Sequence, residues 1–96
     1  MRPSDALRIH RDIVVAEVAL ARFENPRVFG SVARNDDREG SDLDLLLDVP
    51  RGVTFLDMFG LQERLEALLG VSVDIVSARG LHSSIRSDIM AQARAL

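Results

Sequence analysis

The chain has 96 residues, of which 47% are hydrophobic and 28% are charged, and its formal net charge is −3. This length predicts one small domain over residues 1–96 with a modest core, to whose stability a partner protein can contribute. The absence of cysteine excludes disulfides, thiolate metal ligands and a cysteine nucleophile. No apolar run approaches the roughly 20 residues that span a bilayer, and no signal-peptide core follows Met1, so we expect a cytoplasmic protein with no membrane contact.

The acidic residues are concentrated in the middle of the chain. Residues 35–76 hold ten acids and three arginines, a charge of −7, whereas residues 1–34 and 77–96 each carry +2. An acidic centre repels the phosphates of a nucleic acid, and four phenylalanines as the only aromatic residues leave little for base stacking. Direct nucleic-acid binding is therefore not expected, while a cation site in the middle of the chain is compatible with this charge.

The first half of the chain reads as a helix followed by a short strand. Apolar residues recur at helical spacing over residues 4–23, with Ser4 as the expected N-cap and Asn25-Pro26 as the expected end of the helix. Residues 27–29 form a short strand candidate that runs into Gly30-Ser31. Glycine and serine at this point indicate a tight turn or the start of a short helix.

The middle of the chain contains a polar loop, a strand and a long helix. Residues 34–41 are rich in turn-forming residues, and strict alternation over residues 42–49 predicts a strand with leucines on one face and carboxylates on the other. Residues 54–69 predict a helix that opens on a Thr-x-x-Asp capping pattern and ends before Gly70. Its buried stripe is expected to comprise Leu61, Leu65, Leu68 and Leu69.

A third strand over residues 71–76 and a closing helix over residues 81–96 complete the pattern. The element order is helix, strand, short helix, strand, helix, strand, helix. Strands interleaved with helices predict an α/β (or α+β) fold with a small mixed three-stranded sheet flanked by helices.

Three carboxylates carry the most specific signal. Asp42 and Asp44 are two positions apart on one strand and share a face, and no Lys or Arg between Ser41 and Pro50 can neutralise them. Asp74 lies on the polar face of a strand that can sit beside the first. Oxygen ligands of this kind suit Mg²⁺, and three of them can hold two ions in a phosphoryl-transfer centre.

Gly30-Ser31 supplies an anion-binding counterpart to these carboxylates. A glycine directly after a strand lets the backbone approach a ligand closely, while Ser31 offers a hydroxyl and Arg34 a positive charge to phosphate oxygens. Each feature alone is typical of an ordinary turn, a solvated strand edge or a charged loop. Their order and spacing together indicate a nucleoside-triphosphate pocket.

The run Val28-Phe-Gly-Ser-Val-Ala-Arg34, followed by Gly40-Ser-Asp-Leu-Asp-Leu-Leu46, resembles the signature of the DNA polymerase β-like nucleotidyltransferase superfamily. Within it the sequence is most similar to the minimal nucleotidyltransferase (MNT) branch, and the likeness covers about residues 27–90, including Val73-Asp-Ile-Val76. One departure is Asn35, which replaces a glycine common in the family. Asparagine tolerates a left-handed backbone, so the turn can be kept.

This resemblance implies a polymerase β palm-like fold and transfer of a nucleotidyl group, usually AMP from ATP, with Mg²⁺. It implies that Asp42, Asp44 and Asp74 bind metal, with Asp74 also assisting deprotonation of the acceptor hydroxyl. Gly30 and Ser31 would hold the triphosphate, and Arg34 and Ser41 belong to the same expected nucleotide-binding set. Minimal members often form toxin–antitoxin pairs in which the MNT protein adenylylates a tyrosine of a HEPN-domain ribonuclease.

Two other functions remain open from the sequence. A catalytically silent antitoxin would neutralise a HEPN toxin by binding alone, and a small-molecule nucleotidyltransferase would share the same active-site pattern. The latter needs additional structure to hold its acceptor, which so short a chain does not provide.

Several further residues carry weaker signals, and we expect ordinary structural roles for them. His10 and His82 are expected to be exposed, and Arg79 and Arg86 to be solvated, with contact to a triphosphate or an acidic partner as the alternative. At the start of the second long helix, Phe55, Met58 and Phe59 are either core or a partner-binding patch, and we favour core.

Overall fold

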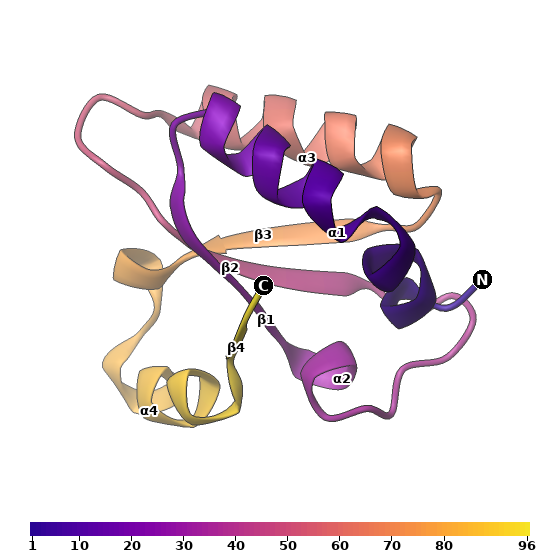
Figure 1. Ribbon diagram of the computed structural model, residues 1–96. Coiled ribbons are helices and arrows are strands. Elements are labelled where there is room, and N and C mark those ends of the chain that lie inside the picture. Colours follow the sequence, from indigo (N-terminus) through magenta and orange to yellow (C-terminus); the bar gives the residue numbers. More distant parts are fainter.

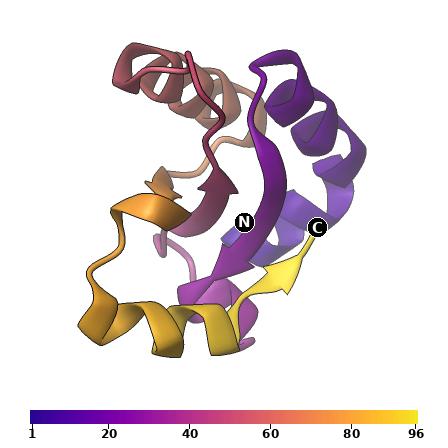
Figure 2. The ribbon, with the colours of Figure 1, turned by 90° about the vertical axis from the view of Figure 1, so that its left-hand side faces the viewer.

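The computed structural model describes residues 1–96 and has one mixed sheet with helices on both sides (Figure 1). Its elements in chain order are α1 (Pro3–Leu20), β1 (Glu24–Phe29), α2 (Gly30–Ala33), β2 (Leu43–Asp48), α3 (Phe55–Leu69), β3 (Val73–Ser77), the 3₁₀ turn η1 (Ala78–Gly80), α4 (Ser83–Gln92) and β4 (Arg94–Ala95). Helices α1 and α3 lie side by side over one face of the sheet, and α4 lies toward the other (Figures 1 and 2). No helix is both long enough and apolar enough to cross a membrane.

The sheet has four strands in the order β3-β2-β1-β4, so the expectation of three strands is wrong. Strand β2 runs parallel to β3, whereas β1 is antiparallel to both β2 and β4. The closing helix does not extend to residue 96: α4 ends at Gln92, and Arg94–Ala95 pairs with β1. This pairing supplies hydrogen-bond partners to an edge of β1 that would otherwise be open, and the Leu96 N–H donates to the Pro26 carbonyl at 3.1 Å.

The connection between α1 and β1 also differs from the sequence expectation. Helix α1 ends at Leu20, and Asn25-Pro26 lies inside β1 rather than at a helix end. Left-handed backbone at Arg22 (φ 69°) and Asn25 (φ 52°) redirects the chain, and the β1–β2 register shifts between Glu24 and Arg27. Proline, which has no N–H to donate, is tolerated at such a bulge.

Helix α1 begins two residues earlier than the expected N-cap implies, with Pro3 as its first helical residue and Arg2 rather than Ser4 at the N-cap. The cap is supplied from a distant part of the chain. The Ser4 backbone N–H donates to a carboxylate oxygen of the buried Asp37 at 2.9 Å. The loop after α2 is thereby attached to the first turn of α1.

The core lies between one face of the sheet and the two long helices. Alternate residues of β2 (Leu43, Leu45 and Leu47) are fully buried there, together with side chains of β3, α1 and α3. Helix α3 has the expected limits: Thr54 and Asp57 form a capping box, and Gly70 (φ 70°) ends it in the left-handed region. In α3, Leu61, Leu65 and Leu69 are buried as expected.

Three apolar side chains of α3 do not follow the expected burial. Phe55 is 77% exposed, Phe59 is 61% exposed and Leu68 is 43% exposed, so the core assignment is wrong for both phenylalanines and for Leu68. Met58 packs against the core while remaining partly exposed. The core stripe passes through Met58, Leu61, Leu65 and Leu69, and this spacing leaves Phe55 and Phe59 to one side.

An ion pair joins the first two strands on the face away from α1 and α3. The buried Arg27 donates from Nη2 to Asp48 Oδ1 at 2.8 Å, and the Asn25 amide donates to Asp48 Oδ2 at 3.2 Å. Burial would raise the pKa of Asp48, but hydrogen bonds from Arg27 and Asn25 and the charges of Arg27 and Arg79 outweigh it and lower that pKa.

We expect Asp48→Asn to destabilise the protein at neutral pH and to flatten its acid-induced loss of stability. A carboxyl whose folded pKa is lowered stabilises the fold above its unfolded pKa of about 3.9, and this contribution is lost as pH falls through the folded value. The effect is about 1 kcal/mol or less because the Asp48 side chain is 44% exposed. Urea unfolding of the wild type and of Asp48→Asn from pH 7 to pH 2 measures this difference in the free energy of unfolding. A constant difference between the two curves over this range would contradict the assignment.

Candidate active site

The Asp44 carboxylate packs directly against Gly30. Gly30 follows β1 with a left-handed φ of 68°, and a Cβ built on it would lie 2.3 Å from Asp44 Oδ2 and 3.2 Å from Asp44 Cγ. Residues Phe29 and Asp44 are paired across β1 and β2, which brings the β1–α2 turn beside the carboxylate. Only glycine leaves room for this approach, so the β1–α2 turn and the Asp44 carboxylate form one structural unit.

The second and third carboxylates lie beside Asp44. Asp74 is the register partner of Asp44 across the parallel strands β2 and β3, so the two side chains project from the same face with a strand spacing of about 4.8 Å. Asp42 lies one residue before β2. Burial raises the pKa of Asp44, and the negative charges of Asp74 and Asp42 raise it further, while Arg34 opposes them. Asp44 and Asp74 therefore project from one face of the sheet, and the charge of the nearby Asp42 also acts on Asp44.

The remaining predicted residues divide into two groups. Gly30, the half-buried Ser31 and Arg34 lie in or beside the turn after β1. The charge of Arg34 acts on Asp44, and its guanidinium also donates hydrogen bonds to Asp36 and Gln92 at 3.3 Å. Ser41 is engaged elsewhere: its hydroxyl accepts from the Arg38 backbone N–H at 2.9 Å. The structure thus joins Gly30, Ser31 and Arg34 with the carboxylates, and holds the Ser41 hydroxyl in the preceding loop turn.

The donor set is compatible with Mg²⁺ only in combination with further oxygen ligands. No three His, Asp or Glu side chains are arranged as a complete metal-binding group. Proteins commonly hold Mg²⁺ with one or two carboxylates plus substrate phosphates and waters. Asp42 and Asp44 could supply the carboxylates, and a divalent cation would offset the mutual repulsion that raises the pKa of Asp44.

An apolar hollow lies at the β3 edge of the sheet, on the side covered by α3 and not on the face from which Asp44 and Asp74 project. It has a volume of about 350 Å³ and is lined by Phe55, Met58, Phe59, Gln62, Asp74 and Ile75. Sequence reasoning assigned its phenylalanines to the core. Their helical positions, which lie beside the stripe of Leu61, Leu65 and Leu69, could have indicated that these phenylalanines do not face the core.

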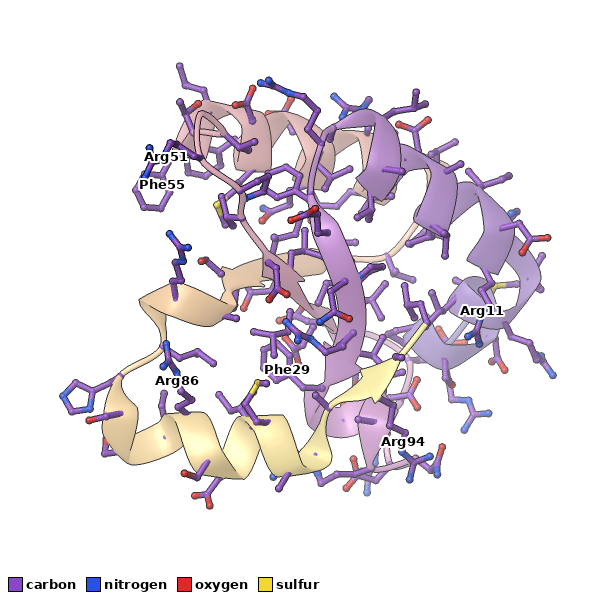
Figure 3. All side chains as sticks on the ribbon, turned by 60° about the vertical axis from the view of Figure 1, so that its left-hand side comes forward. Arg11, Phe29, Arg51, Phe55, Arg86 and Arg94 are labelled. Carbon is purple, nitrogen blue, oxygen red and sulfur yellow. The ribbon has the colours of Figure 1, made fainter.

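The other basic and imidazole side chains lie outside this group. His82 is exposed and His10 is half-buried within α1. Arg86 lies at the start of α4 and donates to the backbone carbonyls of Ala78 and Arg79, so it ties α4 to η1 (Figure 3). Phe29, on the same face as Asp44, lies between β1 and α4 (Figure 3).

Residues 9–96 match the family described as nucleotidyltransferase domain. The chain belongs to this nucleotidyltransferase family. A solved structure of a candidate minimal nucleotidyltransferase is 46% identical, covers 97% of this chain and 95% of its own, and superposes with a TM-score of 0.88. The expectation of an MNT-type nucleotidyltransferase with this fold is thereby confirmed, with a fourth strand added to the sheet.

Two other similarities concern the activity and the assembly of relatives. The protein adenylyltransferase MntA of Thermococcus cleftensis is 41% identical over 63 residues, which is 66% of this chain and 64% of that protein. A toxin–antitoxin crystal structure with AMP-PNP is 16% identical, with a TM-score of 0.77, and covers 88% of this chain and 69% of its own. At this identity the second similarity shows a shared fold.

Proposed function

We propose that this nucleotidyltransferase transfers AMP from ATP, with Mg²⁺, to a tyrosine hydroxyl of a partner HEPN toxin and thereby acts as its antitoxin. The observation that carries the proposal is the packing of Asp44 against Gly30 beside Asp74, which joins an acidic centre to a glycine turn. The adenylyltransferase relative and the AMP-PNP complex of a toxin–antitoxin pair with the same fold support adenylyl transfer and a toxin partner. The choice of a HEPN toxin and of a tyrosine acceptor rests on the sequence resemblance.

In this reaction the chain's own residues bind and orient the nucleotide. Gly30 and Ser31 would contact the triphosphate through backbone N–H groups and the Ser31 hydroxyl, and Arg34 would contribute a positive charge. Asp42 and Asp44 would hold Mg²⁺, and Asp74 would be a ligand of a second ion. The metal would supply Lewis-acid stabilisation of charge on the phosphate oxygens. Asp74 would accept the proton of the acceptor hydroxyl.

The proposed transfer is a single displacement at the α-phosphorus of ATP. The acceptor oxygen forms a bond to the α-phosphorus of ATP while the bond from that phosphorus to the oxygen bridging it to the β-phosphorus breaks. Pyrophosphate leaves, the hydroxyl proton passes to the Asp74 carboxylate, and AMP remains attached to the acceptor through a phosphodiester. The nucleotidyltransferase itself contains no tyrosine, so modification of tyrosine occurs in trans.

The test combines the chain with the protein encoded by the neighbouring reading frame, Mg²⁺ and ATP labelled at the α-phosphate. We expect label on a tyrosine of the partner, located by mass spectrometry, and no label when Asp42→Asn replaces the wild type. Equal labelling by both proteins would contradict the catalytic proposal. Protection against the toxin by Asp42→Asn without any labelling would instead identify an antitoxin that acts by binding alone.

A further inference from the structure

We infer that Gln92, at the end of α4, is a positioning residue that holds the Arg34 guanidinium ready to contact the phosphates of the nucleotide. The inference rests on the proposed function and adds to it a residue from a distant part of the chain. It also assigns a functional role to α4, which contributes no buried side chain to the fold.

Helix α4 is placed by polar contacts and by the strand that follows it. Among its residues only Ile89 is half-buried, and the others are exposed. Burial of an apolar face, the usual source of helix stability in proteins, is therefore small. At its start the Arg86 guanidinium donates to two carbonyls of η1, and at its end β4 pairs with β1. These two attachments fix the last turn of α4, and with it Gln92, relative to the sheet.

The Arg34 guanidinium is held from two sides. Its Nε–H donates to Asp36 Oδ2, and its Nη1–H donates to Gln92 Oε1, each at 3.3 Å. Asp36 belongs to the same local unit as the Gly30 turn, because its backbone N–H donates to the Ser31 carbonyl at 3.0 Å. Gln92 lies 58 residues further along the chain than Arg34 and fixes the guanidinium from outside that unit.

These two contacts leave the rest of the guanidinium available to a ligand. A guanidinium carries five N–H donors in one plane, and the bonds to Asp36 and Gln92 use only one on Nε and one on Nη1. The Arg34 side chain is 49% exposed, so a ligand can reach the remaining donors. Its charge acts on Asp44, which places the guanidinium near the acidic centre. Paired donors of this kind suit phosphate oxygens.

A guanidinium that is already held binds a phosphate at lower cost. A free arginine side chain has many rotamers, and ordering it on binding costs free energy. The contact with Asp36 alone leaves the guanidinium able to turn about a single hydrogen bond, whereas the second contact with Gln92 fixes its plane. The amide of Gln92 is neutral, so it provides this contact without offsetting the positive charge that attracts the phosphates.

The test compares the binding of AMP-PNP with Mg²⁺ by wild type and Gln92→Leu in titration calorimetry. Leucine suits a helix but cannot accept a hydrogen bond. We expect the Kd to rise about fivefold, the size of one hydrogen bond, and the KM for ATP to rise equally with kcat unchanged. Gln62→Leu is the matched control, because it makes the same substitution on α3, over the other face of the sheet (Figure 2). It should leave these constants unchanged.

Two further measurements show whether Gln92 acts through Arg34. In an Arg34→Ala background, Gln92→Leu should cause no additional loss of affinity, since the group that Gln92 positions is absent. In the ligand-free wild type, the Arg34 Nε–H signal in side-chain NMR should exchange slowly with water, and Gln92→Leu should accelerate this exchange. A general structural role of Gln92 would weaken binding equally in both backgrounds.

The outcomes separate this inference from the proposed function. An equal or lower Kd in Gln92→Leu, or a loss of affinity that persists in the Arg34→Ala background, would overturn the inference and leave the activity standing. Binding of AMP-PNP that depends on Gln92 through Arg34, without any AMP transfer by the wild type, would support the inference and overturn the activity.

Discussion

Asp44→Asn is expected to lower AMP transfer by at least about a thousandfold and, at the same time, to raise the melting temperature. Under the proposed mechanism the loss follows because a metal ion held by Asp44 would contribute several kcal/mol of transition-state stabilisation, and each 1.4 kcal/mol is about tenfold in rate. The rise in melting temperature follows because burial and two neighbouring carboxylates raise the pKa of Asp44. A carboxyl with a raised folded pKa costs stability at pH values above its unfolded pKa, and the amide removes that cost.

Calorimetry and an AMP-transfer assay on the same preparations measure both effects. Asp12→Asn is the matched control, since Asp12 is exposed on α1 and its replacement changes the net charge equally. It should leave activity unchanged. A melting temperature of Asp44→Asn below that of the wild type would show that the Asp44 carboxylate is a stabilising group in the ligand-free protein, contrary to the repulsion described above.

Gly30→Ala is expected to reduce AMP transfer by about a hundredfold and to destabilise the fold. The new Cβ would lie 2.3 Å from Asp44 Oδ2, a distance that forces the turn or the carboxylate to move, and the left-handed φ of 68° adds strain. A shift of about 1 Å in a catalytic group can cost this much in rate.

Gly70→Ala separates the two causes. Gly70 has a nearly equal φ of 70°, and a Cβ there would meet nothing within 4 Å. This control should lose about 1 kcal/mol of stability and keep its activity. If both alanine variants retain full activity, the close approach of Gly30 to Asp44 has no role in the reaction.

Local patterns in the sequence predicted the elements that position the site. The alternation around Asp42 and Asp44 predicted β2 and its acidic face, and the pattern from Thr54 to Gly70 predicted α3 with both of its ends. The direct pairing of Asp44 with Asp74 required that β2 and β3 be parallel neighbours in one particular register. The roles of these residues in metal binding and catalysis remain predictions.

Features that depend on distant parts of the chain were not predictable in the same way. Strand β4 has two residues and exists through its pairing with β1, while the cap of α1 comes from Asp37, far along the chain. The exposure of Phe55 and Phe59 depends on how α3 is rotated over the sheet. Phenylalanine is usually buried, so residue type alone predicts burial here. Only the positions of Phe55 and Phe59 on the helix, relative to the core-facing leucines, indicate that they are exposed.

The central claim is that the three carboxylates and the Gly30 turn form one metal–nucleotide centre. The most direct test titrates the protein with Mn²⁺ and a non-hydrolysable ATP analogue and follows paramagnetic broadening of backbone amide signals by NMR. We predict that broadening is strongest at Gly30, Ser31, Asp42, Asp44 and Asp74, and that it requires the nucleotide. Broadening centred elsewhere, or unchanged in Asp42→Asn, would contradict the claim.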